Sequence, residues 1–261
     1  IGDVRVLRLV RAWLKAGIME EGRIEHPVKG TPQGGVISPL LSNIMLHEVD
    51  RQWCNEDGQT RSDVVLVRYA DDMVLLAKTA TAAKQAWQRL QSQFAELHLE
   101  VNQEKSRLTT ATEGFAFLGF EFRTRKRRLY MWPRKKACQH IRARIRETVY
   151  RTPSTVSLSE LIRKLNPVLT GWCTYFRVGN SNRVFHSIDE YARSTVHLWL
   201  RRKHACEWST ARKRWPYQTL HETYRLYRMV GKVSHLEGLR RKPTEEDGRR
   251  AGCGKAARPV R

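Results

Sequence analysis

Apolar residues in the first part of the chain recur at helical spacing in two segments. The first segment covers residues 4–16 and stops at Gly17, and the second runs from Ser38 to Val49. Between these two predicted helices, residues 30–35 form a glycine-rich loop. Pro39 suits the first turn of the second helix, because that position does not need a backbone N–H donor.

Two short apolar runs then flank an acidic pair. The runs cover residues 63–69 and 73–77, and Ala70-Asp71-Asp72 lies between them. Runs of this length and composition, joined by a short turn, predict a β-hairpin with two aspartates at its tip. The elements predicted after it are an amphipathic helix over 81–97 and strand-like pieces over 99–109 and 115–122, the last of which bends at Gly119.

From about residue 136 onward the apolar pattern is helical, as in residues 158–169 and 191–200. After about residue 236 large apolar residues almost vanish, which predicts a disordered basic tail. We therefore predict an α+β chain whose antiparallel sheet has helices on one face. The predicted domains are a sheet domain over 1–133, an all-α domain over 134–205 and a basic region over 206–261.

Composition narrows the functional classes. The 261 residues are 41% apolar, which is enough for one sizeable core or two smaller ones. No apolar stretch approaches the length of a membrane span. The five cysteines are scattered without a CxxC pair, so neither a structural zinc site nor a disulfide framework is predicted. A reducing interior is the expected environment.

The positive charge is concentrated in the second half of the chain. The net charge is +22, yet residues 1–120 carry 14 Lys+Arg against 15 Asp+Glu, whereas residues 121–261 carry 34 against 11. A polyphosphate partner is the natural counter-charge for this half. The alternative is a solvated basic surface without a partner. The basic clusters are Arg123 to Arg128, Arg134 to Lys136, Arg201 to Lys203 and Arg212 to Arg214.

Adjacent aspartates at a hairpin tip repel each other, whereas tight hairpins usually prefer Asn-Gly or Asp-Gly. A hard cation such as Mg²⁺ relieves this repulsion, because it prefers carboxylate oxygens together with substrate phosphates. Two such ions can activate an attacking 3′-hydroxyl and stabilise a pyrophosphate leaving group. For an isolated acidic pair, an exposed turn without a role is the alternative.

Tyr69-Ala70-Asp71-Asp72 resembles the YADD box of reverse transcriptases, in the form typical of group II intron proteins. Further segments resemble the other motifs of this family, in the family's order, over roughly residues 4–205. They are the GTPQGGVISPLLSN segment at 30–43, the LEVNQEKS segment at 99–106, the FLGF primer-grip segment at 117–120 and the NPVLTGW thumb segment at 166–172.

The resemblance implies a polymerase site that uses two Mg²⁺ ions, with Asp71 as a ligand of both ions and Asp72 as its supporting neighbour. It makes Lys105 the candidate for protonating or steadying pyrophosphate, with a solvated lysine as the alternative. Tyr69 is expected to pack beneath the primer terminus, with a plain core aromatic as the alternative. The residues implied to contact nucleotide and template are Pro32, Gln33, Gly34 and Tyr69.

The resemblance also implies a primer grip and a helical thumb that binds RNA. The primer grip consists of Phe117, Leu118, Gly119 and Phe120, of which the two phenylalanines also fit ordinary strand core. The predicted RNA-binding residues are Arg142, Arg144, Arg146, Arg201, Arg202 and Lys203. Thumb core, rather than base stacking, is expected of Trp172, Tyr175 and Phe176.

Polymerases of this family need a third carboxylate on an earlier strand, which we do not find before the helix at 4–16. Because the sequence opens with Ile1, we interpret the chain as truncated before this motif and the fingers. We expect it to polymerise poorly on its own. No CxxC follows residue 205, so the endonuclease domain of some relatives is not expected.

The leading hypothesis is an RNA-directed DNA polymerase of the group II intron type with RNA-binding maturase activity. Its expected partners are structured intron RNA, an RNA template, a DNA primer and dNTPs, without a membrane. One alternative is an inactive RNA-binding maturase remnant, and another is a reverse transcriptase of a CRISPR or diversity-generating system. The bacterial cytoplasm is the expected location, with nucleoid association as a further option, and the oligomeric state stays open.

Overall fold

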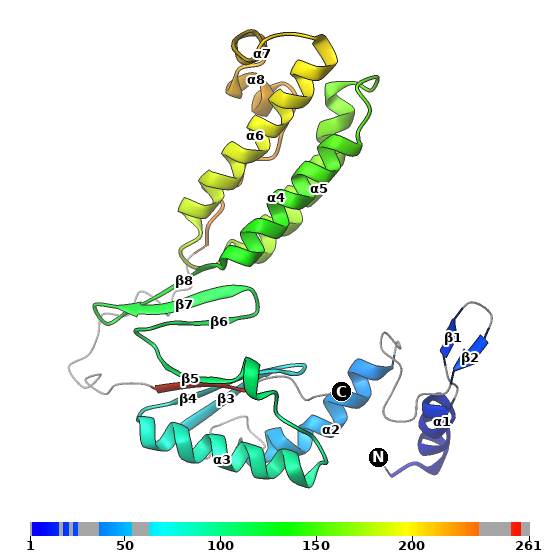
Figure 1. Ribbon diagram of the computed structural model, residues 1–261, viewed down its shortest axis with the longest axis vertical. Coiled ribbons are helices and arrows are strands. Elements are labelled where there is room, and N and C mark those ends of the chain that lie inside the picture. The colour runs from blue at the N-terminus through cyan, green and yellow to red at the C-terminus, as the bar shows by residue number, and fades with distance from the viewer. Residues whose placement is uncertain are drawn as a thin grey trace. The chain divides into compact units, whose positions relative to one another are not determined.

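The computed structural model describes residues 2–15, 18–20, 23–25, 37–53, 63–234 and 252–256. The chain divides into two compact units, of which unit 1 comprises residues 1–109 and 249–261 and unit 2 comprises residues 110–248. Each unit combines helices with small antiparallel sheets around a core of its own, which confirms the predicted α+β class (Figure 1). The units divide at residue 109, whereas the sequence-based boundary lies at 133.

Unit 1 is built around the predicted hairpin. Strands β3 (Val64–Tyr69) and β4 (Asp72–Ala77) pair antiparallel along their whole length. The sheet has the order β3-β4-β9-β5, in which β9 (Gly252–Ala256) is antiparallel to β4 and β5 is Arg107–Thr110. The other elements of unit 1 are α1 (Val4–Lys15), β1 (Ile18–Glu20), β2 (Arg23–Glu25), α2 (Ser38–Trp53), α3 (Ala80–Glu96) and the 3₁₀-helix η1 (Gln103–Lys105).

Helices α2 and α3 lie on the same side of this sheet (Figure 1). Alternation along β3 explains why, since Val64 and Leu66 are buried while Val65 and Val67 remain exposed. The helices were therefore predicted correctly to cover one face. Their contribution to the core consists of Leu46, Val49 and Trp53 from α2 and Ala83, Ala86, Leu90 and Phe94 from α3.

Unit 2 begins with a three-stranded antiparallel sheet, in the order β6-β7-β8. Its strands are β6 (Phe115–Phe117), β7 (Phe120–Arg125) and β8 (Arg128–Pro133). The predicted bend at Gly119 is the turn between β6 and β7, because Phe117 pairs with Phe120. Strand β8 was not predicted from the sequence.

The rest of unit 2 is helical, as predicted from residue 136 onward. The helices are α4 (Lys135–Arg151), α5 (Leu158–Phe176), α6 (Asn182–His204), α7 (Trp208–Arg214) and α8 (Tyr217–Glu222). Trp215, Leu220, Leu226 and Met229 are buried in the same core as α4, α5 and α6. Residues 206–234 therefore belong to the helical fold rather than to a separate basic region.

The stretch after about 236, for which the sequence predicts disorder, lies outside the described residues apart from Gly252–Ala256, which form β9. Among the helices that the structure describes, none is both long and apolar enough to cross a membrane.

Candidate functional site

The YADD turn, Tyr69-Ala70-Asp71-Asp72, joins β3 to β4 at the end of their ladder. Tyr69 pairs with Asp72, which leaves Ala70 and Asp71 as the two turn residues. Ala70 has a φ of 52°, in the left-handed region that an L-residue enters at a cost in free energy. Both aspartates are half-buried, and Tyr69 is 66% exposed. This exposure excludes the reading of Tyr69 as a core aromatic.

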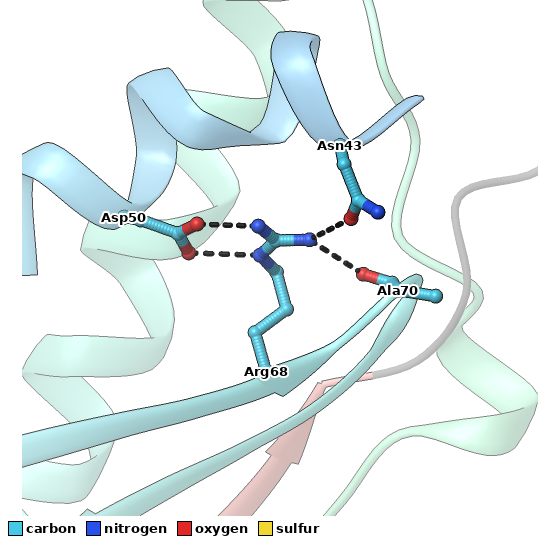
Figure 2. A network of polar contacts seen from close by, with 4 residues as sticks. All are labelled: Asn43, Asp50, Arg68 and Ala70. Carbon is cyan, nitrogen blue, oxygen red and sulfur yellow. Dashed lines mark hydrogen bonds and ion pairs between the residues drawn. The ribbon is translucent and has the colours of Figure 1, made fainter. Parts of the chain in front are cut away.

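Figure 2 shows how the guanidinium of Arg68, on β3, ties this turn to helix α2. Its Nε donates to Asp50 Oδ1 at 2.8 Å and its Nη2 pairs with the other oxygen of the same carboxylate. Its Nη1 donates to Asn43 Oδ1 at 2.8 Å and to the Ala70 carbonyl at 3.0 Å. The hydrogen bonds that Arg68 donates to the Asp50 carboxylate raise the pKa of Arg68 above its ordinary value. One side chain thus fixes the turn carbonyl and two positions on α2.

Sequence reasoning missed this network, although a signal for it exists. Arg68 follows Val64 and Leu66 at every second position of β3, so it occupies the face that α2 and α3 cover. Only 13% of its side chain is exposed. A largely buried cation on this face of β3 requires a carboxylate partner. Asn43 and Asp50 are seven residues apart on α2, and therefore share one helix face.

Of the other residues predicted for this site, the structure describes only some. Lys105 lies at the end of η1 with its side chain exposed, and its backbone N–H donates to Asn102 Oδ1 at 3.1 Å. The predicted nucleotide contacts Pro32, Gln33 and Gly34 lie outside the described residues. Within the part of the chain that the structure describes, no group of three or more His, Cys, Asp or Glu side chains is arranged to hold a metal ion.

The predicted primer grip belongs to unit 2, where its turn rests on helix α5. Leu118 and Gly119 have φ values of 46° and 81°, and the Tyr175 hydroxyl donates to the Leu118 carbonyl at 2.9 Å. A Cβ on Gly119 would approach Phe176 Cζ to 3.2 Å, so only glycine fits without displacing this ring. The ring centroids of Phe120 and Phe176 are 4.9 Å apart. The two predicted strand-core residues, Phe117 and Phe120, are both buried.

The aromatic residues of α5 differ in burial. Phe176 is buried in the helical core and Trp172 packs against that core partly buried, as the sequence predicts. The expectation of thumb core is wrong for Tyr175, which is 54% exposed and donates from its hydroxyl to the β6–β7 turn. Asn166, from the same predicted motif, donates to the Arg225 carbonyl at 2.9 Å and accepts from the Tyr227 N–H at 2.8 Å. This motif therefore fastens the last described segment of unit 2 to α5.

Two of the predicted RNA-binding cations are engaged inside unit 2. Arg142 Nη2 donates to Ser187 Oγ at 2.8 Å, and its guanidinium lies 5.7 Å from the centre of the Tyr191 ring. Lys203 Nζ donates to two backbone carbonyls of the α4–α5 connection, at 2.6 and 2.7 Å. Because these contacts join helices, both side chains have a structural role that helical spacing did not reveal.

The remaining predicted cations are accessible. Arg146, Arg201 and Arg202 are exposed, and Arg144 is exposed despite an ion pair of 3.0 Å with Glu147. Exposed ion pairs of this kind contribute little stability and are readily exchanged for another anion. These four side chains are available to phosphate groups.

Comparison with known families covers most of both units. Residues 4–122 match the family described as reverse transcriptase (RNA-dependent DNA polymerase). Residues 138–219 match the group II intron, maturase-specific domain. The chain belongs to the group II intron reverse transcriptase and maturase family. The maturase match extends beyond residue 205, in agreement with the helical fold that continues through α7 and α8.

Individual relatives agree with this assignment. This chain is 35% identical over 159 residues to protein YkfC of Escherichia coli (strain K12), covering 50% of this chain and 42% of that protein. It is 27% identical over 188 residues to the group II intron-encoded protein LtrA of Lactococcus lactis subsp. cremoris, covering 48% of this chain and 31% of LtrA. The chain thus spans less than half the length of these relatives.

Proposed function

We propose that this chain supplies the metal-binding hairpin of an RNA-directed DNA polymerase and an RNA-binding helical unit that assists intron splicing and mobility. The observation that carries the proposal is the position of Asp71 and Asp72 at the tip of a β-hairpin, within the segment that matches reverse transcriptases. The proposed partners are structured intron RNA, an RNA template, a DNA primer and dNTPs.

The donor atoms of the YADD turn fit magnesium. Asp71 and Asp72 offer adjacent, half-buried carboxylates, and Mg²⁺ prefers a few carboxylate oxygens completed by water and substrate phosphates. Two bound Mg²⁺ ions would lower the pKa of the primer 3′-hydroxyl and stabilise the leaving pyrophosphate. Asp71 would hold both ions with Asp72 beside it, while Lys105 would donate a proton or a hydrogen bond to pyrophosphate.

Manganese binding tests the metal part of the proposal. Replacing both aspartates, as Asp71→Asn with Asp72→Asn, is expected to weaken Mn²⁺ binding by about tenfold or more, because amides carry no charge. The affinity is measured from the electron paramagnetic resonance signal of free Mn²⁺.

Asp63→Asn serves as the matched control, because Asp63 lies at the opposite end of the same hairpin, where it pairs with Lys78 at 2.6 Å. The control is expected to bind Mn²⁺ like the parent chain. Equal binding by the double variant and the parent chain would contradict a metal site at the YADD turn.

The second part of the proposal rests on the charge of unit 2. Residues 121–234 carry 26 Lys+Arg and 7 Asp+Glu, so most of the positive excess lies in the described fold. A truncation that tests the tail must therefore begin after Ser234, since Trp215, Leu220 and Met229 are buried in the core of unit 2.

Binding to a structured RNA is expected to weaken steeply with salt, with a slope of log K against log[salt] of magnitude above about 3. The truncation after Ser234 is expected to keep most of this slope, because it leaves the folded cations in place. The measurement is a filter-binding titration at several salt concentrations. A truncated chain that has lost both its affinity and its salt dependence would place the RNA grip in the tail instead.

A further inference from the structure

The turn between β7 and β8 is the most positively charged short segment that the structure describes. Arg125 pairs with Arg128, so Lys126 and Arg127 form a two-residue turn. All four side chains are exposed, and among the described residues none of them forms an ion pair. Arg123, two residues before Arg125 on β7, adds a fifth cation, and its guanidinium donates to the Glu113 carbonyl.

The backbone of this turn is unusual for its residue types. Lys126 and Arg127 have φ values of 46° and 59°, so both lie in the left-handed region. Two-residue hairpins of this kind strongly prefer Asn-Gly, because other L-residues lose free energy there. On grounds of stability alone, Asn-Gly rather than Lys-Arg would be expected at these two positions.

The neighbouring β6–β7 turn also has two residues with positive φ, but it is supported. Its second position is glycine, and its first carbonyl accepts a hydrogen bond from Tyr175. The β7–β8 turn has no glycine, and both of its residues are exposed. Strained backbone that persists at an exposed position points to a function of the side chains.

We propose that the β7–β8 turn is a phosphate-binding tip that holds a nucleic-acid duplex through its sugar-phosphate backbone. A two-stranded β-ribbon fits the major groove of B-form DNA, whereas in A-form RNA the wide minor groove is the accessible one. In either duplex the four cations can contact phosphates beside the groove. The contacts are independent of base sequence, because arginine and lysine meet only phosphate oxygens there. This inference rests on the proposed nucleic-acid binding of unit 2 and assigns part of it to a defined element.

The turn geometry allows a test in which stability and binding move in opposite directions. The double variant Lys126→Asn with Arg127→Gly introduces the preferred turn residues and removes two charges. We expect its melting temperature to equal or exceed that of the parent chain. Its affinity for a short RNA duplex is expected to fall about tenfold, and the salt slope to decrease in magnitude by about 1.5–2.

A charge-matched control separates this tip from general electrostatics. Arg163→Gln with Lys164→Gln removes two adjacent charges from α5, where Lys164 already pairs with Glu160 at 3.2 Å. The control is expected to lose less than half as much slope. A DNA duplex of the same sequence is measured in parallel, and a similar loss on both duplexes is expected for phosphate contacts.

Each other outcome has a defined meaning. The turn variant could keep its affinity, or lose no more than the α5 control loses. Either result would contradict phosphate binding by the β7–β8 turn, while nucleic-acid binding by unit 2 would still stand. If the parent chain bound neither duplex, both the proposed nucleic-acid binding of unit 2 and phosphate binding by the β7–β8 turn would be contradicted. Preferential binding of the tip to vesicles of anionic lipid, rather than to either duplex, would also reject it.

Discussion

Primer extension on an RNA template is expected to fall by at least about a hundredfold when Asp71 is replaced by asparagine, because a carboxylate that holds catalytic metal becomes a neutral amide. Asparagine keeps the size of the side chain and suits a turn, so the fold of the hairpin should survive. The experiment uses the natural protein that contains this sequence, with Mg²⁺ and dNTPs. The initial rate of cDNA synthesis is the measurement.

Asp63→Asn makes the same chemical change at the other end of the hairpin, where the side chain of Asp63 is 74% exposed. It is expected to extend the primer at the parent rate. Retained synthesis by Asp71→Asn would remove Asp71 from the metal site. A parent protein that binds RNA but extends no primer would instead favour the inactive maturase remnant.

The YADD hairpin is predictable from sequence because its determinants are local. Two short apolar runs and a short acidic turn specify β3, β4 and the position of Asp71 and Asp72 within a few consecutive residues. The bend at Gly119 is equally local, since its left-handed backbone needs glycine. Features of this kind can be predicted without knowing which distant segments pack against them.

The features that sequence reasoning missed depend on contacts between distant segments. Arg142 and Arg144 look equivalent on a basic helix, yet Arg142 turns toward Ser187, which is 45 positions away. Lys203 lies in a basic run but holds the carbonyls of a loop almost fifty residues earlier. Charge and helical period do not reveal which neighbour another helix will provide.

Strand β8 and the end of unit 2 were missed for a different reason. The turn of the β7–β8 hairpin lies within the basic run at 123–128. It was not predicted, because Lys-Arg is not a recognisable turn signal. Residues 206–234 were read as a basic region, although Trp215 and Met229 fold back onto the core. A buried carboxylate helps to hold this segment, since Asp189 accepts hydrogen bonds from the Met229 N–H at 3.0 and 3.1 Å.

Arg68→Gln is expected to destabilise the β3–β4 hairpin and its attachment to α2 by about 2–3 kcal/mol, because it leaves a partly buried carboxylate and a turn carbonyl without their donor. The side chains of Arg68 and Asp50 are 13% and 29% exposed, so water replaces the lost contacts only in part. Arg68→Lys is expected to recover part of the loss, since lysine keeps the charge but cannot bridge Asp50, Asn43 and Ala70 at once.

Amide hydrogen exchange measures this effect within unit 1. A loss of about 2–3 kcal/mol corresponds to exchange roughly 30- to 150-fold faster in β3, β4 and the YADD turn. Lys78→Gln is the matched control, because Lys78 pairs with Asp63 on the same hairpin with side chains that are 54% and 74% exposed. Removing this surface pair should change stability by no more than about 0.5 kcal/mol. If Arg68→Gln proved as mild as Lys78→Gln, the turn would be held by its strands alone, and the guanidinium would have no part in placing Asp71 and Asp72.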